Sequence, residues 1–433
     1  MAQARGLAAL AVLLAIVVAL VSPGAASAEP GPDDVIILFR TGTTPGQRDG
    51  VIRFAAGLVK QHFRLAGATA ARVGPLGRRF LARHPAVAAV IPDREVETLG
   101  RLTDLVSGTS PQVVPAGVAR IGARGTGFNG TGIGVAIVDT GIDFRHADLA
   151  VAGACFTAYT SCQDDEGHGS HVAGIVGAKD NTIDVVGVAP AVTLYAVKVL
   201  NRRGRGTDST IMAGLDWIAT NATRVSPAIR VVNMSLGRAG TLGDNPALHA
   251  SVQALHAAGI VVVVAAGNDP AVEVSGQVPA TYPEVVAVAS TTATTGKSSC
   301  AGHPAPVARD TASYFTTDGA YDAGIGVTIS APGEDREDIT KSCVLRSTGI
   351  LSTRLGGGTV RYSGTSMAAP HVAGVVALLM EQSGATAPED VRRRLRLGAD
   401  GLDAAPADSP STGYSFDDER EGIVYVPGAL AQP

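Results

Sequence analysis

Charged residues are scarce in this chain, and neither sign dominates. Lysine, arginine, aspartate and glutamate together make up 17% of the 433 residues, and the formal net charge is −4. Proteins that bind nucleic acid usually show a clustered excess of lysine and arginine. The charge balance therefore indicates no polybasic surface, and we expect no nucleic-acid partner. Apolar residues make up 45% of the chain, which excludes a disordered protein, because so large a fraction supports an extensive core.

Long apolar runs are also rare, and the run near the N-terminus has the features of a secretion signal. Arg5 precedes an apolar run from Leu7 to Val21, and the small residues Ala26-Ser27-Ala28 follow it. Each feature is typical of a cleaved signal peptide. A membrane anchor is the alternative, but the run is short for a spanning helix. We therefore expect residues 1–28 to be a signal peptide, and the remaining chain to be secreted without a membrane anchor.

Cysteine is limited to four residues. In an exported chain, four cysteines suggest two disulfides, for which three pairings are possible. Cys155 and Cys162 are close enough in sequence to close a small loop, and Cys300 and Cys343 would then form the second bridge. Buried free thiols are the alternative, although export makes them less favourable. Sequence alone leaves the pairing open.

The first segment of the chain, residues 29–108, predicts a small α+β domain followed by a linker. Val35–Phe39 and Val87–Ile91 have the apolar character of strands, and Gln47–Leu58 is expected to form a helix. Thr98–Pro111 is polar and contains glycine and serine, which is typical of a linker. The remaining residues, 109–433, are numerous enough for one large domain.

From about Gln112 onward, apolar strands alternate with helices rich in small residues. Strands are predicted for Gly134–Asp139, Leu194–Leu200, Ile229–Ser235, Ile260–Ala266 and Val285–Ala289, and helices for His168–Ala178, Asp208–Ala219, Asn245–Ala258 and Thr365–Met380. Nearly continuous apolar strands indicate burial on both faces, as in a parallel sheet. The pattern therefore predicts an α/β fold with helices on both faces of a parallel sheet.

Residues that carry chemistry lie at the ends of these strands and helices. Asp139, Ser235 and Asn268 each lie at or just beyond the carboxyl end of a predicted strand, where ligands bind in such sheets. His168 and Ser366 lie at helix starts. A serine at a helix start is usually only a cap. The order Asp139, His168, Ser366 is nevertheless one of the known arrangements of an orienting carboxylate, a general base and a nucleophile.

Three segments resemble the signatures of the subtilisin-like serine proteases, the subtilase family. They are Val135–Asp143, His168–Gly174 and Gly364–Gly374, and they occur in the family's order. The resemblance covers Gln112 to about Leu430 and implies a serine endopeptidase of the subtilisin-like fold, which acts through an acyl-enzyme. It assigns the triad to Asp139, His168 and Ser366, and the oxyanion donor to Asn268. Ser170 departs mildly from the family pattern, which usually has threonine.

The resemblance also implies how a protein or peptide substrate binds. Ser235-Leu236-Gly237 resembles the strand edge beside the pocket for the residue before the cut bond, and Gly204-Arg205-Gly206 resembles the opposite edge. An extended peptide would add between them as a strand. Gln277 lies near the base of that pocket, where the family often has glycine, so the preferred side chain there stays open.

The small first domain resembles the inhibitory propeptide of the same family. Val90–Val96 is similar to its C-terminal strand. The resemblance implies a domain that assists folding, occupies the cleft as an intramolecular inhibitor and is removed by the enzyme itself. We expect the cut between about Leu99 and Gln112. The alternative is a permanent accessory domain.

A structural calcium ion is also implied by the resemblance. The residues that match its ligands contribute side chains or backbone carbonyls: Gln112, Asp148, Lys179, Asn181, Ile183 and Val185. Such an oxygen-only set suits calcium. A polar loop without an ion is the alternative. His168 and His171 have a zinc-like spacing, but no third ligand pattern accompanies them.

Two other classes of function compete with an endopeptidase. A catalytically silent peptide-binding scaffold is disfavoured because all four catalytic positions are filled. An esterase-type hydrolase is disfavoured because Ser366 does not lie in a G-x-S-x-G sequence. We expect neither an organic cofactor nor an oligomer, and predict a monomer.

Overall fold

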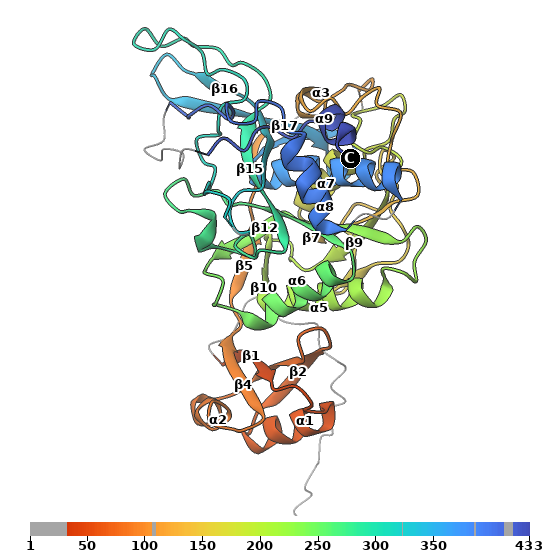
Figure 1. Ribbon diagram of the computed structural model, residues 1–433, viewed down its shortest axis with the longest axis vertical. Coiled ribbons are helices and arrows are strands. Elements are labelled where there is room, and N and C mark those ends of the chain that lie inside the picture. The colour runs from red at the N-terminus through yellow and green to blue at the C-terminus, as the bar shows by residue number, and fades with distance from the viewer. Residues whose placement is uncertain (1–32, 106–109, 323, 385–386, 411–418) are drawn as a thin grey trace, which may run out of the picture.

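The structure, a computed structural model, describes residues 33–105, 110–322, 324–384, 387–410 and 419–433. The expected signal peptide lies outside the described residues. The described chain forms a small N-terminal domain and a larger body, joined through strand β5 (Figure 1). Within the described residues, no helix combines the length and the apolar character that crossing a bilayer requires.

The small N-terminal domain is an antiparallel sheet with two helices. Its elements are β1 (Asp34–Phe39), α1 (Pro45–Phe54), β2 (Leu58–Phe63), β3 (Ala68–Arg72), α2 (Pro75–Leu81) and β4 (Val87–Pro92). The strand order is β2-β3-β1-β4. Helix α1 begins at Thr44, whose hydroxyl accepts from Gln47 N while the Gln47 side chain accepts from Thr44 N. This reciprocal cap satisfies two amides that a helix start leaves open. The predicted α+β domain is therefore present.

The larger body is built on a ten-stranded sheet in the order β6-β18-β17-β16-β15-β13-β11-β7-β9-β8. Seven strands are parallel: β7 (Gly134–Asp139), β8 (Phe156–Thr157), β9 (Thr193–Lys198), β11 (Ile229–Met234), β13 (Val261–Ala265), β15 (Val285–Thr292) and β16 (Ile329–Ile339). Three antiparallel strands extend it: β17 (Leu345–Thr353), β18 (Thr359–Ser363) and β6 (Arg101–Leu105).

Helices cover both faces of this sheet, as the apolar pattern predicts. Val135 and Ile137 of β7 pack in the cluster that contains α4 (His168–Gly177) and α7 (Thr365–Ser383). Ala136 and Val138 of the same strand pack in the cluster with α5 (Asp208–Asn221) and α6 (Pro246–Ala257). Successive side chains of a strand point to opposite faces, so a strand buried on both sides has to be apolar throughout.

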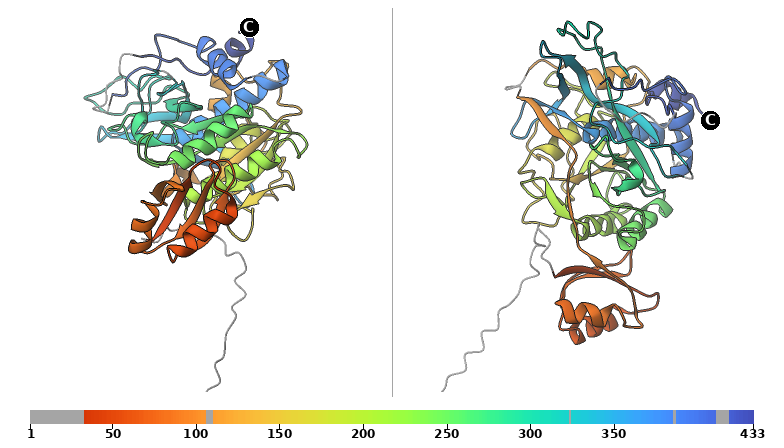
Figure 2. Two further views of the ribbon diagram at one scale, coloured as in Figure 1. Left: turned by 60° about the horizontal axis from the view of Figure 1, so that its bottom comes forward. Right: turned by 90° about the vertical axis from the view of Figure 1, so that its left-hand side faces the viewer.

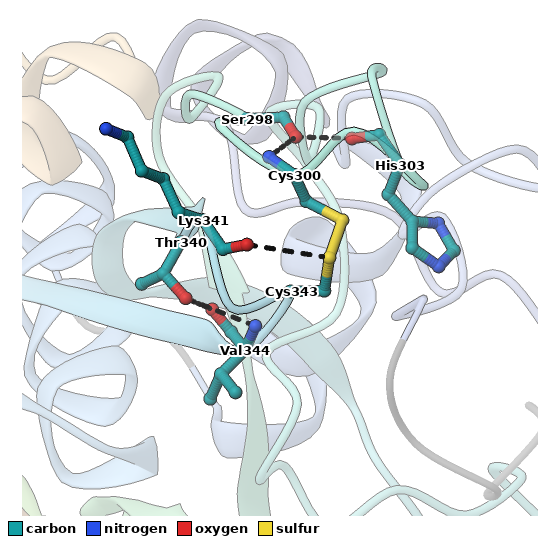
Figure 3. Close-up of a disulfide and its surroundings, with 7 residues drawn as sticks. All are labelled: Ser298, Cys300, His303, Thr340, Lys341, Cys343 and Val344. Atoms are coloured by element: carbon teal, nitrogen blue, oxygen red, sulfur yellow. Dashed lines mark hydrogen bonds between the residues drawn. A yellow bond between two sulfur atoms is a disulfide. The ribbon is translucent and has the colours of Figure 1, made fainter.

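Short elements complete the body. They are α3 (Ala116–Arg120), β10 (Arg205–Thr207), β12 (Leu236–Ala239), the 3₁₀ turn at Val274–Gly276, β14 (Gln277–Val278), α8 (Pro388–Leu397) and α9 (Val426–Ala431). Both disulfides follow the pairing considered from sequence: Cys155 bonds Cys162, and Cys300 bonds Cys343. The second bridge ties the turn between β16 and β17 to the loop that contains Ser298 and His303 (Figure 3).

The segment Thr98–Pro111 is not simply a linker, and that prediction is partly wrong. Residues 101–105 form β6 at the edge of the main sheet, paired with β18. Just before it, β5 (Glu95–Thr98) lies between β10 and β12 in a separate sheet of order β10-β5-β12-β14. Figure 2 (right) shows this orange segment running from the small domain along the side of the body. Its polar residues form strands because existing strand edges supply their hydrogen-bond partners.

Candidate active site

Asp139 and His168 meet beyond the carboxyl end of β7. Asp139 is the last residue of β7, and His168 is the first residue of α4. His168 Nδ1 lies 2.9 Å and 3.0 Å from the two carboxylate oxygens of Asp139, and both side chains are buried. Gly167 precedes the helix with φ 116°, a conformation that favours glycine. This left-handed residue turns the chain so that α4 begins directly over the end of β7.

Burial and the neighbouring carboxylates act on His168 in opposite directions. Burial is the largest single effect and lowers the pKa of the imidazole, but the charge and hydrogen bond of Asp139, together with the charges of Glu166 and Asp164, outweigh it and raise the pKa above its ordinary value. His168 Nε2 has no hydrogen-bond partner among the described residues. With Nδ1 donating to Asp139, Nε2 of the neutral ring is a free acceptor. The ring is thus oriented to take a proton at Nε2.

Ser366 is the second residue of α7, and Gly364, with φ 152°, leads into the helix. The Ser366 hydroxyl donates to Ser235 O at 3.0 Å, and the Ser235 hydroxyl donates to Ser366 O at 2.9 Å. The Ser366 hydroxyl therefore bonds to Ser235 here and makes no hydrogen bond to His168. Hydroxyl side chains exchange rotamers readily, so a rotation about χ1 redirects this oxygen.

Two donors converge on one carbonyl oxygen of the chain itself. Asn268 Nδ2 donates to Leu99 O at 2.7 Å, and Ser366 N donates to the same oxygen at 3.2 Å. Asn268 is held in place because its Oδ1 accepts from Thr365 N and from the Thr365 hydroxyl, each at 2.9 Å. The geometry is that of an oxyanion hole filled by a peptide carbonyl.

The peptide bond to which this carbonyl belongs, Leu99–Gly100, lies next to His168. A Cβ built on Gly100 would lie 2.7 Å from His168 Nε2, so only glycine fits there without displacement. The Leu99–Gly100 peptide bond thus has the two donors on its oxygen and the imidazole beside its next residue. The sequence predicts a cut only between about Leu99 and Gln112, because no residue pattern singles out this bond.

Both predicted substrate edges bind the strand before this bond. Thr98 N donates to Gly204 O at 3.0 Å, and Leu99 N donates to Ser235 O at 3.3 Å. In register, Arg205 and Gly206 of β10 pair with Glu97 and Val96, while Leu236 and Gly237 of β12 pair with Thr98 and Glu97. The residues predicted to bind a peptide backbone therefore do so here, with the chain's own residues 95–99.

Gln277 lies on β14, which pairs with the β12 edge that binds residues 97 and 98. It is buried at the start of β14, and a Cβ on Gly267 would lie 3.1 Å from its Cγ and Cδ. On β12 itself, a Cβ on Gly237 would lie 3.1 Å from Leu99 Cδ1. A glutamine in this position fills volume that glycine would leave open.

Five of the six residues predicted to bind calcium, Gln112 among them, form one hydrogen-bonded group. Gln112 Nε2 lies 2.8 Å from Lys179 O, 3.3 Å from Val185 O and 3.5 Å from Asn181 Oδ1. Asp148 accepts from Asn181 Nδ2 at 2.7 Å and from Val185 N at 3.2 Å. Ile183, the sixth, lies on the same loop and pairs with Pro111. We call this group the Gln112 cradle. Among the described residues, no group of three or more His, Cys, Asp or Glu side chains has metal-site geometry.

Two other histidines near the site serve packing. His171 is buried and bonds to Ile350 O at 3.0 Å, and His371 bonds to Met367 O at 2.8 Å. Burial lowers the pKa of His171 to about 3 and that of His371 to about 4. Both rings are therefore neutral at ordinary pH. Ser170 donates to Asp164 and accepts from Asp143 N, as a threonine hydroxyl in its place would.

Most of the chain is similar in sequence to known proteins. The model of the subtilase family matches residues 130–415. Subtilisin E of Bacillus subtilis is 34% identical over 361 residues, which cover 82% of this chain and 81% of that protein. Alkaline elastase YaB of a Bacillus species is 35% identical over 323 residues, covering 73% and 70%.

Solved structures share the fold. Fervidolysin of Fervidobacterium pennivorans, described as a keratinolytic enzyme related to subtilisin, superposes with a TM-score of 0.64 at 21% identity. The match covers 94% of this chain, which spans 62% of the length of fervidolysin. The matched family model and the identity to subtilisins together show that this chain belongs to the subtilase family of serine peptidases.

Proposed function

We propose that the protein is a secreted serine endopeptidase, made as a zymogen, with Ser366 as nucleophile. One observation carries the proposal: the Leu99–Gly100 bond lies in the site as a substrate bond would. Its carbonyl oxygen accepts from Asn268 Nδ2 and Ser366 N, and its next residue abuts His168 Nε2. Peptide hydrolysis needs these three elements around one bond.

The chemistry follows from the positions of the hydrogen-bonding groups. Ser366 Oγ turns from Ser235 O towards His168 Nε2, gives up its proton there and attacks the Leu99 carbonyl carbon. The oxyanion that forms is stabilised by the two donors already aimed at it. His168, held by Asp139, then passes the proton to the Gly100 nitrogen as the bond breaks. Water hydrolyses the acyl-enzyme in the reverse sequence of proton transfers.

The same geometry supports self-processing at the Leu99–Gly100 bond. Residues 29–99 would then leave as the propeptide, after the signal peptide, residues 1–28, has directed secretion. Until it leaves, the small domain inhibits the enzyme by filling the cleft with β5. Hydrogen bonds support this contact: Asp93 accepts from Ser209 N at 2.9 Å in a buried bond, and Asp216 accepts from Leu65 N at 3.0 Å in a partly buried one.

Calcium suits the Gln112 cradle. Carbonyl oxygens of Lys179 and Val185 and Asn181 Oδ1 converge on the Gln112 amide, and the Asp148 carboxylate lies beside them, bonded to Asn181 Nδ2. Turning this amide by 180° presents Oε1 instead of Nε2 to the group, which leaves an oxygen-only set around one centre. The residues present therefore fit a structural cation, which would fix the loop after α4 to the start of the peptidase domain.

Intact mass and N-terminal sequencing test the function directly. We expect the wild-type chain to yield a fragment that begins at Gly100, whereas Ser366→Ala keeps the small domain attached. Ser275→Ala, a serine substitution outside the site, should process normally. Unprocessed wild-type chain that also fails to react with a fluorophosphonate would refute the proposal in favour of a silent scaffold. A chain that reacts with the fluorophosphonate and, before that reaction, hydrolyses esters but no folded-protein substrate would indicate an esterase.

A further inference from the structure

The chain continues through the cleft beyond the Leu99–Gly100 bond. After Gly100, β6 runs antiparallel to β18, with Arg101 opposite Ser363 and Leu102 opposite Tyr362. Thr103 reinforces the pairing, because its hydroxyl donates to Arg361 O at 3.2 Å and accepts from Gly349 N at 3.1 Å. Strand β18 leads directly into Gly364 and the Ser366 turn. It therefore forms the edge on which residues after a cut bond lie.

A cavity of 260 Å³ opens beside the second residue after the bond. It is lined by Arg101, Thr103, Asn268, Pro270, Tyr314, Phe315, Ser347 and Ser363. Arg101 and Thr103 are two positions apart on β6 and so share one face of the strand. The cavity adjoins the oxyanion donor Asn268, and two aromatic rings contribute to its wall. Arg101, the second residue after the bond, therefore lines this cavity, and its side chain is exposed there.

Two buried carboxyl groups lie behind the serine wall of this cavity. Glu334 and Glu337 of β16 are both 0% exposed. Glu334 Oε2 accepts from the Ser347 hydroxyl, which is also hydrogen-bonded to the Ser363 hydroxyl. Glu337 Oε1 accepts from Tyr314 N at 2.9 Å. Ser347, Ser363 and Tyr314 all line the cavity, so each carboxyl group is one residue away from it.

Within the described residues, no basic side chain forms an ion pair with either of these two carboxyl groups. Glu334 and Glu337 take part in no ion pair there, and Arg361 of β18, two strands away in the sheet, bonds to Asp335 instead. Glu334 Oε1 and Glu337 Oε2 have no partner other than each other's carboxyl group. Burial, together with the charge of Glu337, raises the pKa of Glu334 well above its ordinary value. Burial raises the pKa of Glu337 as well. Two carboxyl groups this close titrate together, and above the first of their two ionisations the pair carries one negative charge and shares the remaining proton.

We propose that Glu334 and Glu337 make this cavity select a basic side chain, arginine or lysine, at the second residue after the cut bond. A buried charge acts strongly on a cation because the low dielectric between them screens little. Arg101 occupies the position in the one sequence seen bound there. The inference rests on the proposed endopeptidase activity and adds to it a preference on the far side of the bond.

Internally quenched peptides test the preference. The peptides take residues 96–103 of this chain, Val-Glu-Thr-Leu-Gly-Xaa-Leu-Thr, with Xaa as arginine, lysine, citrulline, leucine or glutamate. Citrulline keeps the shape of arginine and removes its charge. Val-Glu-Thr-Leu-p-nitroanilide has no residue beyond the cut bond, so it reports the basic activity alone. Each substrate is assayed with the processed wild-type chain, the double variant Glu334→Gln/Glu337→Gln and Asp338→Asn. The last removes a carboxylate from the same strand that does not line the cavity.

We expect kcat/KM for the arginine peptide to exceed that for the citrulline peptide by roughly tenfold or more in the wild type and in Asp338→Asn. The ratio should fall close to one in the double variant, while anilide hydrolysis changes little. A wild-type ratio near one overturns the inference, and that comparison needs no variant to fold. A high ratio that persists in the double variant also overturns it. A processed wild-type chain that hydrolyses no anilide would instead refute the proposed endopeptidase activity.

Discussion

At the scale of single residues, Asn268 does two things in the site. Its Nδ2 donates to Leu99 O, while its Oδ1 accepts from Thr365 at the start of α7. Its position after a strand, within Ala-Gly-Asn, could be predicted from sequence, and its role came from resemblance. The second contact could not be predicted, because it depends on how α7 approaches β13 in three dimensions.

Removal of the Asn268 donor should slow the chemical step without unfolding the protein. We expect Asn268→Ala to lower kcat by about 100- to 1,000-fold, the loss that removal of one such donor causes in this family. Asn268→Asp keeps the acceptor for Thr365 but lacks the donor, so it should lose activity equally while its melting temperature stays near that of the wild type. Steady-state kinetics and thermal melting measure the two effects. A loss below tenfold in both variants would contradict the oxyanion role.

Gln277 should restrict the side chain accepted before the cut bond. The glutamine is packed against Gly267, and Leu99 packs against Gly237 on the adjoining strand β12. Gln277→Gly removes this volume, so we expect kcat/KM for phenylalanine or tyrosine at that position to rise roughly tenfold relative to leucine. Anilides that differ only at this residue measure the ratio. An unchanged ratio would show that Gln277 does not shape the pocket.

At the scale of elements, the sequence predicted what local pattern determines. The apolar strand Gly134–Asp139 matches β7 residue for residue, and the helix predicted to begin at His168 does so. Strands β6 and β16 to β18 were not predicted. Arg-Leu-Thr-Asp-Leu in β6 and the acidic stretch of β16 are poor strand sequences. They form strands because neighbouring strands supply partners, and such pairing has no signature in a short window.

The Cys300–Cys343 bridge should stabilise the β16–β17 hairpin that carries Glu334. It closes a loop with a sequence separation of 43, against 7 for Cys155–Cys162. A longer loop loses more entropy in the unfolded chain when closed, so the two bridges differ by about 1.5 kcal/mol on this argument. We expect Cys300→Ser/Cys343→Ser to lower the melting temperature more than Cys155→Ser/Cys162→Ser. Calorimetry of both variants decides, and the reverse order would contradict the prediction.

At the scale of the whole molecule, the contact between the small domain and the body should depend on pH. Burial raises the pKa of Asp93 to about 6, although its bonds to Ser209 oppose the shift. Burial also raises the pKa of Asp216 in the same contact. When the small domain and the body are separate, Asp93 and Asp216 have ordinary, lower pKa values. Association of the two parts therefore takes up protons. Affinity should therefore be highest at low pH and fall as pH rises towards 6, by at most about tenfold per unit for each proton.

Size-exclusion chromatography of the processed protein between pH 4 and pH 8 measures this dependence. We expect Asp93→Asn to reduce the slope, because the amide keeps an acceptor for Ser209 and cannot titrate. Asp49→Asn changes a carboxylate of the same domain that lies outside the contact, and it should leave the slope unchanged. Affinity that rises with pH would contradict the sign of the prediction.

Calcium at the Gln112 cradle should stabilise the body as a whole. A ligand that binds only the folded state adds stability in proportion to the logarithm of its concentration over its dissociation constant. We expect chelation to lower the melting temperature of the wild type, and Gln112→Ala or Asn181→Ala to abolish the difference. Asp180→Asn, beside the cradle and paired with Arg124, should keep it. An equal response in all four proteins would place the ion elsewhere.

One unbroken chain holds Leu99 in the cleft and Gln112 in its cradle at the same time. Hydrolysis between Leu99 and Gly100 would therefore separate β5 from β6. Each strand keeps its own hydrogen-bonded neighbours: β5 lies between β10 and β12, and β6 lies beside β18. The new amine remains next to the carbonyl it has just left, at an effective concentration fixed by geometry rather than by dilution. Resealing then competes with water at the ester, and the nick becomes permanent only when the small domain departs.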